Sequence, residues 1–506
     1  MRMCDIQSRD FMDIKEIISL AREKKKLLKP SAAEVLKNYP DEQIREIIDK
    51  LANIKSNFIS ESDIKEITNE IKRPDFIEIK RSSDFHPTAK EYGHDFKIYE
   101  DHDITGKSKC KGELDDFVKY FKDRYRRIRE LFISRAINKF PIVDIDKLSD
   151  VKVGDTVRII AMISNKLITK NKHIMLTVED ETQSTNVLVL NNSDKKELYD
   201  SAMRIVNDEV LAIDVKKGTN LLIVTNITWP DLPFKEKKKT EKDISFAFIS
   251  DIHIGSSHFM SKNFENMLKW LNGSGPRKDL AEKVGYLLLG GDLVDGIGIY
   301  PNQDKELVIK DVYDQYKLLN QFLEMVPDHI KIIAIPGNHD AVRHAEPQPS
   351  LPEKLLVKDG RTFSVGNPAY MNIEGLHVQM YHGYTMESLV QDVQGLSLGK
   401  PEEIAIELLK RRNMSPIFDK SMIVPEHRDM MFIEEIDVFL TGHIHKIGYG
   451  EYRGCVIMNG GTWIDKTTSW QLRRGFTPTP AIMGVYDMKN ARVSHLDFST
   501  SEVAFQ

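Results

Sequence analysis

The stretch Ala247-Phe248-Ile249-Ser250-Asp251-Ile252-His253-Ile254-Gly255 indicates both the fold and the chemistry of this chain. The apolar run over residues 244–249 predicts a buried strand, and Gly255 interrupts the pattern shortly afterwards. Because side chains two residues apart on a strand point to the same side, Asp251 and His253 can converge on one point. A carboxylate and an imidazole at a strand end are typical of a metal site, although an ordinary loop explains so short a pattern equally well when it stands alone.

Four later stretches repeat this design, each an apolar run that ends in polar side chains beside a glycine. They are residues 286–295, 332–340, 378–383 and 438–445. A glycine next to the polar group fits a sharp turn where the backbone approaches a bound ion or substrate. In α/β sheets, ligands bind beyond the carboxyl ends of the strands, which is where these residues fall. Five such strand ends in chain order favour one shared metal site over five unrelated loops.

The polar residues at these strand ends offer only oxygen and imidazole nitrogen atoms. The candidate metal ligands are Asp251, His253, Asp292, Asn338, His382, His443 and His445. A set without thiolates suits Mn²⁺, Mg²⁺, Fe²⁺ or Zn²⁺ in a hydrolytic role better than structural zinc, and Mn²⁺ is our first choice. Since seven ligands exceed what one ion takes, we expect two divalent metal ions that share a carboxylate.

The five motifs resemble those of a known enzyme family. Asp-x-His, Gly-Asp-x-x-Asp, Gly-Asn-His-Asp, Tyr-His-Gly and Gly-His-x-His, in this order, are similar to the motifs of the calcineurin-like metallophosphoesterases. The resemblance covers about residues 245–465 and implies an α/β fold, a two-sheet β-sandwich flanked by helices, with a dinuclear site between strand-end loops.

The resemblance also implies a role for each candidate residue. One ion would be held by Asp251, His253, Asp292 and His445, and the other by Asp292, Asn338, His382 and His443. His339 would not bind metal but would protonate the leaving oxygen of a phosphate ester, and Asp340 is the candidate that orients it.

Length and composition restrict the class of protein. The chain has 506 residues, 41% of them hydrophobic and 29% charged, which indicates a globular protein of several domains. It has no run of about 18 uninterrupted apolar residues and no apolar segment typical of a signal peptide. The three cysteines, Cys4, Cys110 and Cys455, form no C-x-x-C pair, which fits a cytoplasmic localisation. A net charge of −5 gives no overall basic field, so nucleic-acid contact would need local patches or a partner's surface.

The first 150 residues divide into three parts. Residues 1–72 predict a small helical module, which either docks onto a partner or DNA or is simply a solvated bundle. Residues 73–112 predict a polar linker, partly mobile. Residues 113–150 contain a long amphipathic helix and a connection. The basic run of this helix is expected on a solvated face, with phosphate contact as the alternative; it comprises Arg124, Arg126, Arg127 and Arg129.

The middle of the chain predicts a barrel. Residues 151–232 contain three strands, a helix and two further strands, which is the order of an OB-fold. OB-folds often bind single strands through stacking aromatic residues, but these strands have almost none, so docking or scaffolding is an equally good interpretation. A charged linker, 233–243, precedes the calcineurin-like domain at 244–506.

The order of these domains resembles the small-subunit family of archaeal family D DNA polymerases over nearly the full chain. The related B-subunits of eukaryotic polymerases have lost metal ligands, whereas every ligand position is filled here. The resemblance therefore implies a metal-dependent 3′–5′ exonuclease that proofreads DNA, prefers single-stranded or mismatched 3′ ends, and pairs with a large catalytic polymerase subunit.

Two other functions stay open. One is a phosphodiesterase or phosphatase for small molecules, which would not need about 240 residues of accessory sequence. The other is a non-catalytic polymerase scaffold, which would not need an intact ligand set. Two loops, 299–303 and 344–352, could shape a nucleic-acid channel. Four residues after the last motif either contact a strand or serve packing and partner contact; these are Trp463, Trp470, Arg473 and Arg474.

Overall fold

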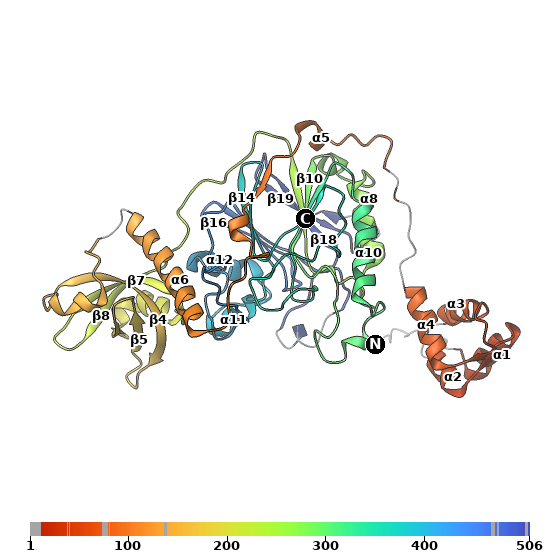
Figure 1. Cartoon of the computed structure of the whole chain (residues 1–506), viewed down its shortest axis with the longest axis horizontal. Helices are drawn as coiled ribbons and strands as arrows, with labels where there is room; N and C mark the ends of the chain where they lie inside the picture. The colour runs from red at the N-terminus through yellow and green to blue at the C-terminus, as the bar shows by residue number, and fades with distance from the viewer. Residues whose placement is uncertain are drawn as a thin grey trace, which may run out of the picture.

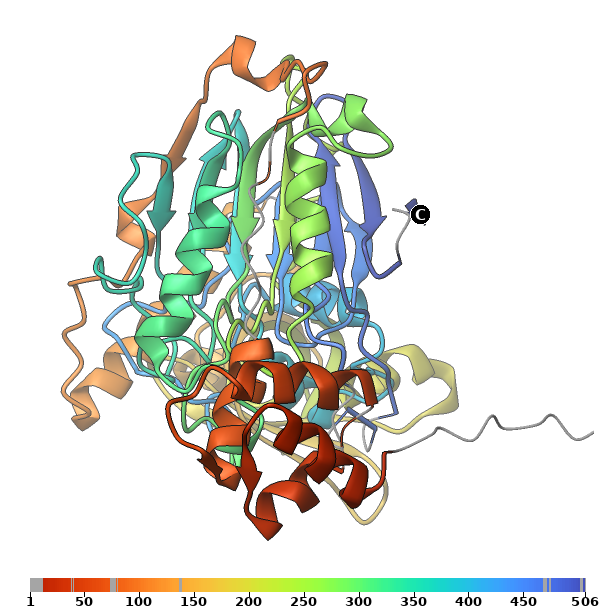
Figure 2. The same ribbon diagram turned by 90° about the vertical axis from the view of Figure 1, so that its right-hand side faces the viewer.

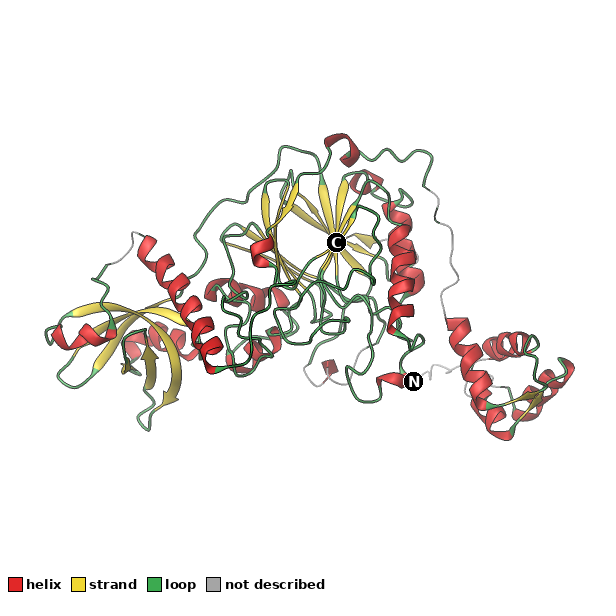
Figure 3. Cartoon of the chain, in the orientation of Figure 1, coloured by secondary structure: helices red, strands yellow, loops and turns green. Residues whose placement is uncertain are grey.

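The computed structural model describes residues 12–37, 39, 41–72, 79, 81–135, 139–466, 471–472, 475–500 and 504–505. They form a small helical module, a closed barrel and a large two-sheet sandwich (Figures 1 and 3). None of the helices in these ranges combines the length and the apolar character needed to cross a bilayer.

The helical module has a core of its own. It contains α1 (Ile14–Glu23), α2 (Pro30–Leu36), α3 (Asp41–Leu51) and α4 (Glu61–Lys72), with a parallel pair of short strands, β1 (Leu27–Leu28) and β2 (Phe58–Ile59). Apolar residues three or four apart on the helices point inward, as Ile44 and Ile48 do on α3. Asp13 caps α1 by accepting from the backbone N–H groups of Lys15 and Glu16.

The segment after this module differs from the expected polar linker over 73–112. It contains α5 (Ala89–Tyr92) and β3 (Phe96–Ile98), and β3 pairs antiparallel with β13 at the edge of a sheet. Phe96 packs edge-to-face against Tyr286 and Phe363, so this strand is tied to the sandwich core. A three-residue strand is too short for its alternation to stand out in the sequence. Residues 73–78 and 80 of the expected linker lie outside the described residues.

Five strands close the barrel in the order β4-β5-β6-β8-β7. They are β4 (Thr156–Ile168), β5 (Ile174–Glu179), β6 (Ser184–Val189), β7 (Val210–Lys217) and β8 (Leu222–Thr228). Helix α7 (Lys196–Met203) lies between β6 and β7 in the chain, so the observed element order is the one that the sequence predicts. The long helix α6 (Leu114–Ser134) packs Tyr125, Ile128 and Phe132 against β4 and β7.

The basic run of α6 was expected on a solvated face, and this is wrong for Arg124. Its side chain is only 1% exposed and donates to Asp429 Oδ2 across 2.7 Å. The guanidinium lies over the ring of Tyr120. A polar residue that interrupts an apolar stripe looks solvated in the sequence unless its buried partner is known, and Asp429 is about 300 residues away.

The sandwich consists of a seven-stranded and a six-stranded sheet. The order of the first is β12-β11-β10-β9-β18-β19-β20, comprising β9 (Ser245–Ile249), β10 (Val284–Leu289), β11 (Lys331–Ala334), β12 (Thr362–Ser364), β18 (Ile482–Asp487), β19 (Arg492–Asp497) and β20 (Ala504–Phe505). The order of the second is β16-β17-β15-β14-β13-β3, comprising β13 (Ala369–Ile373), β14 (Leu376–Tyr381), β15 (Val438–Thr441), β16 (Gly448–Tyr452) and β17 (Cys455–Asn459). Strands β9 to β12 are parallel to one another, as are β14, β15 and β17.

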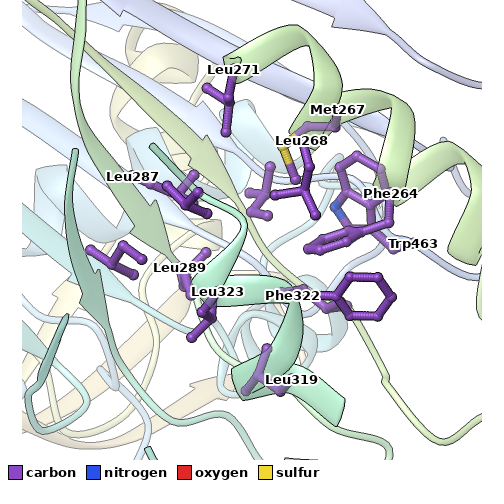
Figure 4. Close-up of a cluster of buried hydrophobic side chains, with 14 of the residues drawn as sticks. Phe264, Met267, Leu268, Leu271, Leu287, Leu289, Leu319, Phe322, Leu323 and Trp463 are labelled. Atoms are coloured by element: carbon purple, nitrogen blue, oxygen red, sulfur yellow. The ribbon is translucent and has the colours of Figure 1, made fainter. Parts of the chain in front are cut away.

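Helices cover the outer faces of both sheets. Helices α8 (Ser261–Leu271), α9 (Lys278–Ala281) and α10 (Val312–Glu324) lie on the seven-stranded sheet (Figure 2), and α11 (Met386–Asp392) and α12 (Pro401–Arg411) lie on the other. In Figure 4, leucines of β10 face the apolar side chains of α8 and α10, with Trp463 beside them. Among the described residues, four short 3₁₀ segments lie at Glu100–His102, Ile145–Asp150, Ser193–Lys195 and Gln303–Lys305.

Strand β9 shows why the central strands are mostly apolar. Phe246 and Phe248 point into the core between the two sheets, whereas Ala247 and Ile249 point toward the helices. Both faces of the strand are therefore buried, and neither needs polar side chains. After Ser245 at the start of the strand, polar residues return only where β9 ends, at Ser250.

Candidate metal centre

The five strand ends with candidate ligands meet at one place. Strands β9, β10 and β11 are neighbours in one sheet, and β14 and β15 are neighbours in the other. Hydrogen bonds join the loops that follow them. The N–H of His443, after β15, donates to Asp251 Oδ2, after β9, across 2.9 Å. The N–H of His339, after β11, donates to Asp292 Oδ1, after β10, across 2.8 Å.

The side chains at these loops form three overlapping groups whose ligand atoms lie within 4.8 Å of one another. They are Asp251 with His253 and His445, His253 with Asp292 and His339, and Asp292 with His382 and His443. Asn338 completes the set, because its Oδ1 lies 3.0 Å from His382 Nε2. All seven predicted ligands are therefore brought together, and Asp292 lies between the two halves of the site.

The backbone at this site is held in an unusual conformation. Five of the seven candidate ligands have positive φ angles: Asp251 (54°), His253 (54°), Asp292 (51°), His443 (69°) and His445 (61°). Each such residue costs about 1–3 kcal/mol, and such strain persists where the surrounding structure holds it for a function. The concentration of strain at the ligands supports a functional site, and residue types alone gave no sign of it.

Two glycines let the loops approach closely enough. A Cβ on Gly337 would lie 2.2 Å from Asp292 Oδ1, and one on Gly291 would lie 2.6 Å from His382 Nδ1. Real Cβ atoms do not come so close, so any other residue would push the carboxylate or the imidazole out of place. The glycines of the second and third motifs therefore set the geometry of the site.

The outward-facing nitrogen atoms of two histidines are held by oxygen acceptors. His253 Nδ1 lies 3.1 Å from Asp295 Oδ1, and His382 Nδ1 lies 2.9 Å from the main-chain oxygen of Gly290. An imidazole that donates through Nδ1 has its lone pair on Nε2 when neutral. The Nε2 atoms of both rings point to the centre, which is the arrangement of metal-binding histidines with a fixed tautomer.

Charges within the site act strongly on one another. Burial alone would raise the pKa of Asp292, but the imidazoles of His382, His339 and His253 outweigh it and hold that pKa well below its usual range. Burial would lower the pKa of His339, but the carboxylates of Asp292 and Asp295 outweigh it and raise that pKa. Asp292 is thus an ionised carboxylate in the middle of a ring of imidazoles.

His339 lies at this centre as predicted, but Asp340 does not orient it. His339 Nδ1 lies 2.8 Å from the main-chain oxygen of Asp295. The Asp340 carboxylate instead accepts from the N–H of Gly337 (2.8 Å) and the hydroxyl of Tyr316 (2.8 Å). It also accepts from the N–H of Leu293, so it fastens the loop after β11 to the loop after β10. Neighbours on a sharp turn point in different directions, which sequence adjacency does not reveal.

Three residues near the ligands were missed as site residues in the sequence. Asp295 contacts both His253 and His339, and Gln303 holds it by donating to its main-chain oxygen (2.7 Å) and to Oδ2 (3.0 Å). Glu387, on α11, lies 3.0 Å from His443 Nε2. The second aspartate of Gly-Asp-x-x-Asp was a usable signal for Asp295, whereas nothing in the sequence marks Gln303 or Glu387.

One of the four residues after the last motif, Trp463, does not have the nucleic-acid contact that the sequence analysis considered. Trp463 is fully buried beside Phe264, in the core under α8, so it is not available to stack on a nucleic-acid strand. Trp470, Arg473 and Arg474 lie outside the described residues.

The donor set fits divalent metal ions. It combines carboxylate, amide and imidazole groups without thiolates, in a buried site where imidazole Nε2 atoms face one another and Asp292. The model for the calcineurin-like phosphoesterase family matches residues 244–447. This domain is a metallophosphoesterase, a class that uses divalent metal ions to hydrolyse phosphate esters.

Relatives identify the family more closely. The chain is 40% identical to the DNA polymerase II small subunit of Methanocaldococcus jannaschii over 413 residues, 79% of this chain and 68% of that protein. It is 36% identical to the protein of the same name from Archaeoglobus fulgidus over 391 residues, 76% of this chain and 77% of that one. It is 34% identical to the protein of the same name from Pyrococcus horikoshii over 445 residues, 84% of this chain and 70% of that one. The chain belongs to the family of DNA polymerase II small subunits, which confirms the resemblance in the sequence.

Proposed function

We propose that this chain is a 3′–5′ exodeoxyribonuclease that proofreads for a large DNA polymerase subunit in the cytoplasm. One observation carries the proposal: all seven candidate ligands and His339 converge on a single site in a member of a polymerase-subunit family. A subunit that served only as a scaffold would not need five strained backbone positions at that site.

The ligand assignment follows the three groups of side chains. Asp251, His253 and His445 would hold one ion, and Asn338, His382 and His443 would hold the other. Asp292 would be shared between the two ions, since it belongs to groups on both sides. Two such ions lower the pKa of a water molecule and neutralise the charge of the phosphate when bound, and Mn²⁺ is our first choice.

His339 would supply the proton for the leaving group. In the reaction, the oxygen of water bonds to phosphorus while one water proton passes to solvent, the bond from phosphorus to O3′ breaks, and His339 Nε2 gives its proton to O3′. The products are a nucleoside 5′-monophosphate and a strand with a new 3′ hydroxyl. The main-chain oxygen of Asp295 accepts from Nδ1 and so keeps the Nε2 side of the ring toward the centre.

The partners follow from the names of the relatives. A small subunit implies a large one, so we infer a heterodimer in which the partner carries out polymerisation and this chain removes mismatched or single-stranded 3′ ends. The barrel supports this inference, because a phosphatase for small molecules would not need such a domain. In the heterodimer it would contact either the partner or DNA.

The direct test uses the purified chain, Mn²⁺ and a 5′-labelled oligonucleotide with a mismatched 3′ end. We expect stepwise shortening from the 3′ end, and a loss of roughly 10²–10⁴-fold in His339→Ala. His86→Ala, an exposed histidine outside the site, is the matched control and should retain full activity. Hydrolysis of bis-p-nitrophenyl phosphate without any shortening of DNA would favour a phosphodiesterase for small molecules. If neither substrate is cleaved by the complex with its large subunit, the scaffold interpretation is correct.

A further inference from the structure

We propose that Tyr300 forms a stacking site for an unpaired nucleobase next to the scissile phosphate. The proposal rests on the nuclease function proposed above and specifies how the same site selects its substrate. It concerns the loop over residues 296–303, which follows the Gly-Asp-x-x-Asp motif.

The loop is firmly attached to the metal centre. Gln303 is 2% exposed and donates to Asp295, while its own Oε1 accepts from the N–H of Ile299 across 3.0 Å. At the start of the loop, Gly296 exchanges two hydrogen bonds with the buried side chain of Gln315. A Cβ on Gly296 would lie 2.2 Å from the main-chain oxygen of His339, so the loop lies directly against the proposed general acid.

This fixed loop presents two large apolar side chains to solvent. Tyr300 is 38% exposed and Ile297 is 50% exposed. The ring of Tyr300 lies 6.2 Å from that of His339, tilted by 57°. Its hydroxyl donates to Glu306 Oε2 across 3.0 Å, and Lys466 pairs with the same carboxylate, so the ring has a defined position.

An aromatic ring held open beside the reacting group is the feature that stacks on a base. Every nucleobase has an apolar face, and stacking on an aromatic side chain binds single strands without regard to sequence. Because His339 protonates the leaving O3′, the nearby Tyr300 would meet the base of the nucleotide that keeps this oxygen, the penultimate one. A base inside a duplex is stacked on both faces, so the site would favour frayed ends whose last two nucleotides are unpaired.

The first experiment measures kcat and KM for single-stranded oligonucleotides with full-length variants. Tyr300→Ala should raise KM roughly tenfold, and Tyr300→Phe should restore a value near that of the wild type, because the ring remains. With an abasic penultimate nucleotide, the KM of the wild type should rise by the same factor. The KM of Tyr300→Ala should rise little further on that substrate. If Tyr300→Ala raises KM relative to the wild type by the same factor on normal and on abasic substrates, the proposal is overturned.

Tyr449→Ala is the matched control. Tyr449 is 40% exposed, its hydroxyl donates to Glu451, and its ring lies 6.4 Å from that of His495, so it reproduces the setting of Tyr300 on an edge strand. It should leave KM for DNA unchanged. A rise in KM equal to that of Tyr300→Ala would mean that exposed tyrosines act non-specifically, and the proposal would be wrong.

A binding experiment separates this proposal from the nuclease function. The probe is a single-stranded oligonucleotide with 2-aminopurine at the penultimate position and a phosphorothioate last linkage, titrated with the chain and Mn²⁺. We expect the fluorescence to be quenched by the wild type and by Tyr300→Phe but several-fold less by Tyr300→Ala. Equal quenching by all three would reject the stacking site even if DNA is degraded. Quenching that depends on Tyr300 would support the site even if no degradation is seen.

Discussion

Two buried charged clusters in this molecule are built in opposite ways. The first, which we call the junction cluster, consists of Arg124, Asp429 and Tyr120 together with the main-chain oxygens of Asp208, Ser415 and Pro416. It joins α6, the barrel and the segment before β15. The second is the metal centre. Arg124 and Asp429 are 1% and 0% exposed, as deeply buried as Asp251 and Asp292 at 0% and 1%.

The difference is whether the polar atoms have partners within the chain. In the junction cluster, the guanidinium donates five hydrogen bonds of 2.7–3.1 Å, which is its full capacity. In the metal centre, the Nε2 atoms of His253 and His445 lie 3.0 Å apart, and His382 Nε2 lies 3.4 Å from Asp292 Oδ2. A network closed on itself stabilises the fold, whereas a set of donor atoms aimed at a common point serves a cation from outside the chain.

Removing the central carboxylate, Asp292, should separate the two roles most clearly. We expect Asp292→Asn to lower phosphodiester hydrolysis by roughly a thousandfold or more, because the charge between the two halves of the site is lost. Thermal unfolding in EDTA should hardly change, since asparagine keeps the acceptor for the N–H of His339. Nuclease assays and calorimetry on the same sample check both points. A large drop in melting temperature would show that the centre also holds the fold together.

The junction cluster should behave in the reverse way. Arg124→Met leaves the buried Asp429 carboxylate without its cation, and we expect a loss of roughly 3–5 kcal/mol of stability. Activity per folded molecule should be retained. Arg126→Met is the matched control on the same helix, since its exposed pair with Glu181 is worth about 0–1 kcal/mol. Thermal melts of both variants decide the comparison, and equal shifts would contradict it.

His329 represents a third case, a buried imidazole that belongs neither to the junction cluster nor to the metal centre. Its ring nitrogens have no hydrogen-bond partner among the described residues, and burial lowers its pKa from 6.5 to about 4. Between pH 6.5 and 4, the imidazole of His329 is therefore protonated in the unfolded chain but neutral in the folded one. The free energy of unfolding is therefore highest above pH 6.5 and decreases as the pH falls toward 4. The full effect is roughly 3 kcal/mol. His329→Phe should flatten the pH dependence of the melting temperature between pH 4 and 6.5, and an unchanged slope would refute this account.

The smallest expected effect concerns Asp295, which supports the metal centre by contacting His253 on the side away from its Nε2 atom. Asp295→Asn removes the charge opposite His253 Nδ1 but keeps an oxygen there, so we expect half-maximal activity to need a roughly tenfold higher Mn²⁺ concentration. Titration of activity with Mn²⁺ measures it, and isothermal titration calorimetry measures metal binding separately. Asp279→Asn, an exposed aspartate on α9, is the control. An effect as large as that of Asp292→Asn would make Asp295 a ligand.

What the sequence could predict follows from local pattern. The strand ends at Asp251, Asp292 and His382 are each preceded by an apolar run and accompanied by glycine, so both the sheet and the ligands could be inferred from residue order alone. The order of elements in the barrel was predictable for the same reason.

What the sequence could not predict depends on contacts between distant residues. Arg124 fits a solvated face until Asp429 is placed against it. The carboxylate of Asp340 adjoins His339 in the chain but serves Gly337 and Tyr316 in the fold. Backbone strain at the ligands results from the meeting of several loops, so no single stretch of sequence encodes it.

The pairing of β3 with β13 has a consequence for the order in which the chain folds. Strand β3 is made before the barrel, whereas β13 is made long after it, so the six-stranded sheet cannot be completed until most of the chain has been synthesised. The barrel, by contrast, is formed from strands close together in sequence and can fold early. On the ribosome, the sandwich would therefore assemble beside a barrel that is already folded, and the metal centre would form only after the barrel, because His443 and His445 are made late in the chain.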